Sequence, residues 1–228
     1  MTIKFGPGTT ISGFAHPGGG GGGGGGSMTA PSTAPVDPFG GSGPSWSFNG
    51  INNGVSALID NNSMVVANGD PWCVEGFWYQ TDNNAYPRLF SIGQYPSTSI
   101  AISLEGSTMY FWLNSGIAAT FTKPTTNNWH HFAMASDGST TTFFVDGLQV
   151  GSASVTIPDV TGTTLWIGCE AGATGPSDFG GYMNSFRWTV GNQIYTGDFT
   201  VPTSALTWTG AADTNINEVT SGQVKLIY

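Results

Sequence analysis

Short segments in which apolar residues alternate with small or polar ones fill the chain from Trp46 onward, and they constrain its fold more than any other feature. In SIAISL, for example, Ile100, Ile102 and Leu104 alternate with small residues. A period of two is typical of a β-strand with one buried face. No stretch keeps an apolar period of about 3.6 residues over several turns, so we expect very little helix.

The segment TTFFVDGLQVGS contains the strongest turn signal, because Asp146-Gly147 suits the type I′ turn of a two-residue β-hairpin. In MYFWLN, Tyr110 and Trp112 are expected on the face opposite Met109. Further strands are expected in TTLWIGC, YMNSFRWTV and GQVKLIY. Strands at this spacing, with both faces often apolar, predict an all-β fold: an antiparallel two-sheet jelly-roll sandwich.

Charged residues are unusually rare. They make up 8% of the 228 residues, against about 25% in typical globular proteins, and the net charge is −9. The five cations are scattered and form no basic stripe, so we expect neither nucleic acid nor an anionic membrane surface as a partner. No long apolar run suggests a membrane span, and MTIKFGPGTTISGF lacks the apolar core of a secretory signal, which predicts synthesis in the cytoplasm.

Residues 1–44 differ from the rest and are interpreted as an N-terminal arm, followed by the sandwich domain at 45–228. The arm contains nine consecutive glycines, Gly18–Gly26, which cannot bury apolar surface and are expected to form a spacer. Ahead of this spacer, apolar residues again alternate with small ones. The residues expected to anchor the arm, by adding a strand to a partner's sheet or filling its groove, are Ile3, Phe5, Ile11 and Phe14.

Several longer motifs follow one another along the chain: WSFNG, WCVEGFWYQTDNNAYPRLFSIG, NNWHHFAMASDGSTTTFFVDGLQVGS, LWIGCEAG, GYMNSFRWTVGNQIYTGDFTVPTSALT and VKLIY. In this order they resemble the laminin-G-like jelly-roll domains of the concanavalin A-like superfamily, especially the versions found in bacteriophage structural proteins. The resemblance implies that GQVKLIY lies beside SWSFNG, because the terminal strands of these domains meet. Members of the superfamily include glycan-binding modules, adhesion domains and some glycosidases, so the fold alone does not specify the function.

The acidic residues lack the pairing that a glycoside hydrolase needs. Laminarinase-like hydrolases of the superfamily carry acids at alternate positions of one strand, and a retaining pair lies about 5 to 5.5 Å apart. A glutamate at position 75 is common in the related domains, which implies a structural role. The glutamates here are isolated, with no acid two residues away: Glu75, Glu105, Glu170 and Glu218. We therefore expect no enzymatic activity.

His130 and His131 are adjacent in an expected strand, so their side chains should point to opposite faces and cannot bind one ion together. We expect one to pack under a sheet and the other to meet solvent or a loop. His16 lies in the arm, and the spacing supports no Ser-His-Asp arrangement. Cys73 and Cys169 fit no metal motif; two free cysteines are the favoured interpretation, and a bridge between them is the alternative.

No cofactor is predicted, although calcium is left open. Some laminin-G-like domains bind Ca²⁺ at one rim of the sandwich through Asp side chains and backbone carbonyls, and hard oxygen ligands suit that ion. The chain has no DxDxDG cluster, and Asp residues in loops commonly make turns. The aspartates in expected loops are Asp60, Asp70, Asp82, Asp159 and Asp178.

The aromatic residues favour a carbohydrate-binding surface as a second interpretation, although most large aromatics of a sandwich fill its core. Those that could offer a flat surface to a sugar ring are Trp72, Trp78, Tyr86, Trp112, Trp166 and Trp188. The loop YQTDNNAYPR is the exposed candidate for glycan contact, through Tyr79, Asn83, Asn84, Tyr86 and Arg88.

Two classes of function follow. The first is a virion structural protein, a capsid decoration or short fibre, present in many copies or as a homo-oligomer on the virion surface. Its arm would attach it to other virion proteins of the capsid or collar, and it would be made in the host cytoplasm. The alternative is a tail adhesin or cell-surface module that binds host surface glycans.

Overall fold

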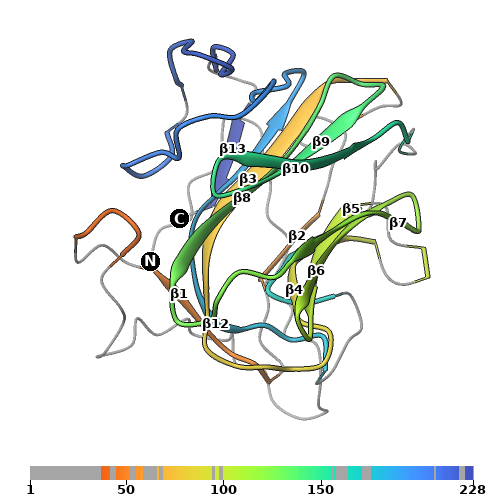
Figure 1. Ribbon diagram of the computed structural model, residues 1–228, viewed down its shortest axis with the longest axis vertical. Coiled ribbons are helices and arrows are strands. Elements are labelled where there is room, and N and C mark those ends of the chain that lie inside the picture. Colours follow the sequence, from red (N-terminus) through yellow and green to blue (C-terminus); the bar gives the residue numbers. More distant parts are fainter. Residues whose placement is uncertain are drawn as a thin grey trace.

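The computed structural model describes residues 37–41, 45–51, 55–58, 66, 69–93, 96–97, 100–155, 157, 164–170, 176–207, 209–220 and 224–227. These residues form two antiparallel β-sheets (Figure 1). The seven-stranded sheet has the order β1 (Trp46–Asn49), β12 (Gly180–Val190), β3 (Trp72–Gln80), β8 (Trp129–Ser136), β9 (Thr141–Val145) and β10 (Leu148–Ala153), and β13 (Val224–Ile227) also pairs with β12. The six-stranded sheet has the order β2 (Val55–Leu58), β11 (Thr164–Ile167), β4 (Arg88–Ile92), β5 (Ile100–Glu105), β6 (Thr108–Leu113) and β7 (Gly116–Thr122). The predicted all-β antiparallel sandwich is confirmed.

The main core lies between the two sheets. Alternate residues of β6 are buried, so Met109 and Phe111 face the core while Tyr110 and Trp112 face outward, as the alternation predicted. Trp72 and Trp188 stack in this core with ring centroids 5.8 Å apart. Each large apolar side chain removed from water in this way stabilises the fold by about 1.5–3 kcal/mol.

A second apolar cluster covers the outer face of the seven-stranded sheet. The segment after β12, drawn in blue in Figure 1, contributes Ile194, Tyr195, Leu206 and Val219, which pack on residues of β3, β8 and β9. The central strands β3 and β8 are therefore buried on both faces. This burial explains why WCVEGFW and FAMA are nearly continuous apolar runs instead of alternating ones.

The predicted hairpin at Asp146-Gly147 is confirmed. Both residues have positive φ, 50° and 78°, as a type I′ turn requires, and the turn joins β9 to β10. A second turn of this kind joins β6 to β7 through Asn114 and Ser115, with φ of 47° and 66°. This second turn carries no Gly-based signal, because neither of its central residues is a glycine.

The terminal strands require a correction. β1 pairs with Gly180–Met183 of β12, whereas β13 pairs with Phe186–Thr189 of the same strand. The two strands therefore lie end to end along one edge of β12, and the expectation that they lie side by side is wrong. The reason is the length of β12, whose 11 residues accommodate both short strands in succession.

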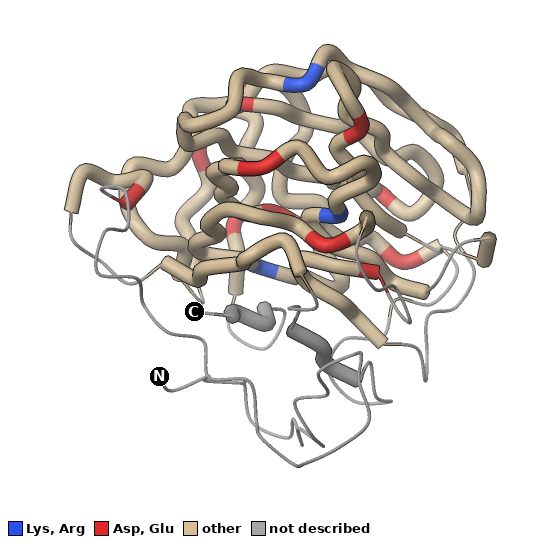
Figure 2. The backbone as a smooth tube through the Cα atoms, turned by 90° about the horizontal axis from the view of Figure 1, so that it is seen from below, with Lys and Arg blue, Asp and Glu red and all other residues tan. Residues whose placement is uncertain are grey.

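Charged positions are sparse in the described part of the chain, and Figure 2 shows its Lys and Arg positions lying apart from one another. Within these residues there is no helix long and apolar enough to cross a membrane. Cys73 and Cys169 are both buried and free. The arm residues Ile3, Phe5, Ile11 and Phe14 and the glycines Gly18–Gly26 lie outside the described residues, so anchoring stays a prediction.

Candidate functional site

Arg88 lies between two glutamates on the outer face of the six-stranded sheet. It opens β4, Glu105 ends β5, and Glu170 follows β11. Nη1 of Arg88 lies 3.7 Å from Oε1 of Glu105, and Nη2 lies 3.5 Å from Oε2 of Glu170. The register sets this arrangement, because Arg88 pairs with Ser103, whose neighbours Ile102 and Leu104 point into the core.

A chain of hydrogen bonds extends the site along β5 and β6. The indole Nε1–H of Trp112 donates to Oγ of Ser103 over 2.9 Å, and the Ser103 hydroxyl donates to Oε1 of Glu105 over 2.7 Å. The guanidinium of Arg88 lies over the Trp112 ring, 5.3 Å from its centroid, which is a cation–π distance. Tyr110 stands beside this ring with centroids 6.4 Å apart. The site thus combines a flat aromatic surface with charged groups.

The hydrogen-bonding capacity of Arg88 is only partly used. Its side chain is 6% exposed, yet Nε and Nη1 have no hydrogen-bond partner in the structure. The two ion-pair distances exceed the roughly 2.7–2.9 Å of a charge-assisted hydrogen bond. Buried polar groups are normally satisfied, so these two buried donors of Arg88 are an exception to that rule.

The candidate aromatic residues divide between core and surface. Trp72, Trp78 and Trp188 are buried in the main core. Trp112 and Trp166 are half-buried on the outer face of the six-stranded sheet, where Trp166 pairs with Ser91 of β4. Nε1 of Trp166 has no hydrogen-bond partner in the structure. Two of the tryptophans named from the sequence are therefore placed where a ligand can reach them.

The five residues predicted to contact a glycan do not form one continuous surface. Asn83 and Tyr86 are exposed, but Asn84 donates from Nδ2 to the carbonyls of Gly50 and Asp178, each over 2.8 Å, and so braces the loop. Tyr79 lies on the outer face of the other sheet, beside Trp129. Arg88 was expected to be exposed with these residues and is instead buried, because it opens β4 and turns onto the sheet.

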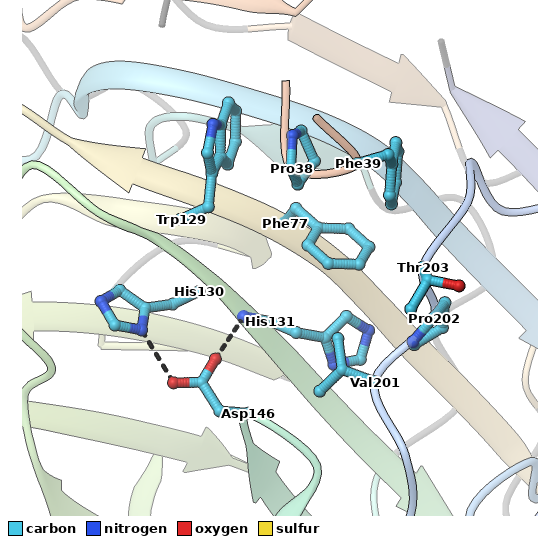
Figure 3. A pocket seen from close by; sticks show the side chains of 10 residues that line it. All are labelled: Pro38, Phe39, Phe77, Trp129, His130, His131, Asp146, Val201, Pro202 and Thr203. Atoms are coloured by element: carbon cyan, nitrogen blue, oxygen red, sulfur yellow. Dashed lines mark hydrogen bonds and ion pairs between the residues drawn. The ribbon is translucent and has the colours of Figure 1, made fainter. Parts of the chain in front are cut away.

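The adjacent histidines point to opposite faces, as predicted. His131 is buried, with its ring against Phe77, whereas His130 is half-buried and places Nδ1 2.8 Å from Oδ2 of Asp146. Both histidines and Asp146 line a pocket of about 360 Å³ on the outer face of the seven-stranded sheet (Figure 3). Phe77 lies in the middle of this pocket, between Trp129 at one end and residues 201–203 at the other.

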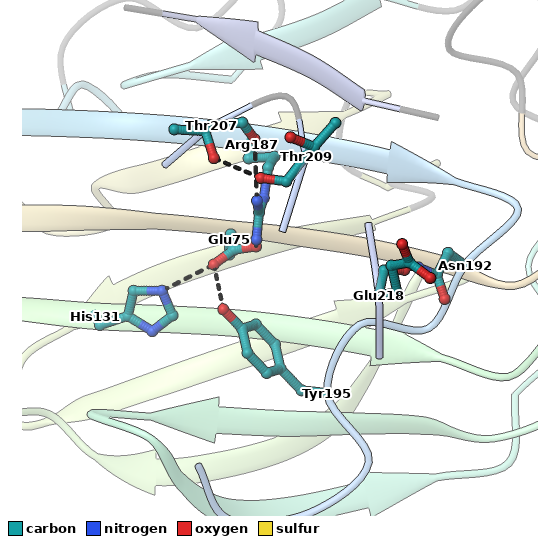
Figure 4. A network of polar contacts seen from close by, with 8 residues as sticks. All are labelled: Glu75, His131, Arg187, Asn192, Tyr195, Thr207, Thr209 and Glu218. Carbon is teal, nitrogen blue, oxygen red and sulfur yellow. Dashed lines mark hydrogen bonds and ion pairs between the residues drawn. The ribbon is translucent and has the colours of Figure 1, made fainter. Parts of the chain in front are cut away.

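Glu75 is the centre of a buried polar network (Figure 4). Its Oε1 accepts a hydrogen bond from Nε of Arg187 over 2.8 Å, and its Oε2 accepts one from the Tyr195 hydroxyl over 2.6 Å. Nε2 of His131 lies 3.2 Å from the same Oε2. Burial opposes ionisation, but the charge of Arg187 and the hydrogen bonds of His131 and Tyr195 outweigh it and lower the pKa of Glu75 to about 2. No solvent reaches this carboxylate, which supports the predicted structural role.

The described residues contain no group of three or more His, Cys, Asp and Glu side chains that could hold a metal ion. Of the aspartates considered for calcium, Asp60 and Asp159 lie outside the described residues. Burial raises the pKa of Asp82, and Asp178 is fully buried. Calcium thus stays the alternative that the sequence left open.

Sequence reasoning missed the relationship among Glu105, Glu170 and Arg88. Each glutamate is isolated along the chain, and the two are 65 residues apart by numbering (170 minus 105). Only the order of strands β11, β4 and β5 brings both carboxylates to one guanidinium. The one usable signal was the alternation of MYFWLN, which placed Trp112 on the outer face.

The fold has solved relatives of low sequence identity. Domain 4 of AbnA, an extracellular arabinanase from Geobacillus stearothermophilus, in complex with arabinotriose, aligns with a TM-score of 0.53 and 19% identity over 67% of this chain and 73% of that one. The native heptameric SAP-like pentraxin from Limulus polyphemus aligns with a TM-score of 0.53 and 14% identity over 79% and 93%. A putative carbohydrate binding protein from Bacteroides ovatus aligns with a TM-score of 0.55 and 15% identity over 80% of this chain and half of the other.

These likenesses show the fold alone. A search of curated protein sequences finds no match for the chain. The family model described as the concanavalin A-like lectin/glucanases superfamily, with the name Laminin_G_3, matches residues 49–190, which is more than half of the chain. The chain therefore belongs to the concanavalin A-like lectin/glucanases superfamily.

Proposed function

We propose that this protein is a carbohydrate-binding module, and that the outer face of the six-stranded sheet holds the glycan. The observation that carries the proposal is the half-buried indole of Trp112, which is linked through Ser103 to the Glu105 carboxylate and lies against the guanidinium of Arg88.

The chemistry of a sugar fits each part of this site. A pyranose or furanose ring has a face of C–H groups that packs on an aromatic ring such as Trp112. Its hydroxyls can donate hydrogen bonds to Glu105, whose carboxylate is an acceptor and whose side chain is 22% exposed. A ligand that bonds to Glu105 in this way gains specificity, because an analogue without the hydroxyls loses that hydrogen bond.

The comparisons agree with this choice without deciding it. The superfamily description names lectins, one similar domain is in complex with arabinotriose, and another is described as a putative carbohydrate binding protein. The comparisons give no support to a bacteriophage origin, so display on a virion through an N-terminal arm stays a prediction of the sequence.

Binding of arabinotriose and of a panel of neutral oligosaccharides, measured by calorimetry, tests the proposal. We expect Trp112→Ala to weaken binding by about tenfold or more, which corresponds to roughly 1.4 kcal/mol. Tyr86→Ala is the matched control, because Tyr86 is an exposed aromatic of the loop that the sequence favoured. Loss of binding in Tyr86→Ala with retention in Trp112→Ala would move the site to that loop and overturn the proposal.

A further inference from the structure

We infer that the pocket on the outer face of the seven-stranded sheet is a second, independent saccharide site. It lies on the opposite side of the sandwich from Arg88 and shares no residue with that site. Its volume of about 360 Å³ is at the lower end of the range of small-molecule sites.

The floor and one wall of the pocket are aromatic. Phe77 of β3 forms the floor, and Phe39 from the segment before β1 packs edge-on against it with ring centroids 5.1 Å apart. The half-buried indole of Trp129 closes one end (Figure 3). These rings provide an apolar surface on which the C–H face of a sugar ring can lie.

Polar groups stand along the opposite rim. The Asp146 side chain is 45% exposed, and each of its oxygens accepts one hydrogen bond over 2.8 Å, from Nδ1 of His130 and from the backbone N–H of His131. A carboxylate oxygen has two lone pairs, so both oxygens retain capacity to accept from a hydroxyl. The exposed hydroxyl of Thr203 is at the far end.

The charges in this pocket select a neutral ligand. Both ring nitrogens of His130 face acceptors, Asp146 and the carbonyl of Thr125 at 3.0 Å, which favours the doubly protonated imidazole, and in that state its charge balances Asp146. A proline-rich peptide would match the aromatic floor but brings no side-chain donor for Asp146, whereas sugar hydroxyls provide several.

A row of aromatic residues continues from the pocket across the sheet. Trp129, Tyr79 and Tyr182 are direct cross-strand neighbours on β8, β3 and β12, and all three are half-buried. The centroid distance is 5.6 Å from Trp129 to Tyr79 and 5.9 Å from Tyr79 to Tyr182. A linear oligosaccharide with one end in the pocket would therefore lie across the strands along this row.

Fluorine NMR of the full chain labelled with 5-fluorotryptophan tests this inference separately from the proposed function. The signals of Trp129 and Trp112 are assigned from Trp129→Phe and Trp112→Phe variants, and the probes are arabinotriose and cellotriose. We expect the Trp129 signal to shift and saturate with one of these probes, whether or not the Trp112 signal responds.

The matched variant is Phe39→Ala, which removes a wall of the pocket outside the strands. We expect it to weaken the Trp129 response by about tenfold while leaving the Trp112 response unchanged. A Trp129 signal that stays still with both probes, or an unaltered response in Phe39→Ala, would overturn the inference. A response to a proline-rich peptide with none to the sugars would overturn the choice of ligand.

Discussion

Nδ1 of His130 lies 2.8 Å from Oδ2 of Asp146, which ties strand β8 to the turn between β9 and β10. Nε2 of the same ring lies 3.0 Å from the Thr125 carbonyl. Burial lowers the pKa of His130, but the hydrogen bond and charge of Asp146 and the Thr125 carbonyl together raise it above its usual value of about 6.5. The pair therefore links the stability of the fold to pH.

The direction of this pH dependence follows from the raised pKa of His130. The stabilisation from protonated His130 is fully present below the unfolded-state pKa of about 6.5 and is lost as pH rises through the higher folded-state value. We expect the midpoint of urea unfolding to fall as the pH rises above the unfolded-state pKa of about 6.5, and His130→Gln to flatten this dependence. An identical pH profile in the variant would show that another group is responsible.

The network around Glu75 leads us to expect a second pH dependence of stability, in acid and of opposite sign. Burial alone would raise its pKa, but Arg187 and the other partners lower it to about 2, so its stabilisation is present above the ordinary value near 4.5 and is lost as pH falls towards 2. Glu75→Gln should destabilise the domain at neutral pH by about 3–5 kcal/mol, because Arg187 stays buried without its counter-charge. Urea unfolding measures this loss. Glu218→Gln is the control, since Glu218 is exposed on the segment that covers the network, and an equal loss in both variants would contradict the assignment.

The two turn glycines Gly147 and Gly106 predict different costs for the same substitution. Both have positive φ, 78° and 57°. A Cβ at Gly147 would collide with the carbonyl oxygen of Phe199, whose N–H is fixed by a 2.9 Å bond to the Gly147 carbonyl, whereas Gly106 has open space. Gly106→Ala should cost about 1–2 kcal/mol for the left-handed backbone alone, and Gly147→Ala clearly more. Thermal unfolding of the two variants checks the difference. Equal costs would show that the segment around Phe199 moves to accommodate the added methyl group.

We expect the purified protein not to hydrolyse polysaccharides. In the described residues the guanidinium of Arg88 occupies the space between Glu105 and Glu170, where a hydrolase would hold the scissile bond. The measurement is the release of reducing sugar from β-glucan and arabinan. Release that disappears in Glu105→Gln or Glu170→Gln would make the site catalytic.

The sequence predicts the fold well because its signals are local. The alternation of MYFWLN and the turn at Asp146-Gly147 each depend on neighbouring residues, and the structure confirms them. SIAISL also forms a strand, but Ala101 and Ser103 are buried as well, so its alternation does not mark one buried face. The same rule placed His130 and His131 on opposite faces. Such local signals cannot show which strands become neighbours in a sheet.

The candidate site depends on that missing information. Glu170 reaches Arg88 only because β11 lies next to β4, and Arg88 is buried because Trp112 and the two glutamates lie against it. The C-terminal segment that covers β3 and β8 was equally invisible, because its apolar residues are separated by turns and carry no period. Propensity and period describe one element at a time, whereas these features arise from tertiary packing.

The end-to-end placement of β1 and β13 along β12 has a topological consequence. Trp46 pairs with Met183 and Ile227 pairs with Phe186, so the first residue of one strand and the last of the other meet partners that are three positions apart (186 minus 183), a separation of about 10 Å. The polypeptide enters and leaves the sandwich at almost the same point. A short linker between these two points would close the domain into a ring, and new ends could then be opened at an exposed turn such as Asn114-Ser115 without breaking a strand. The same geometry lets the whole sandwich be inserted into a loop of another protein as a side branch, with both connections at one edge of one sheet.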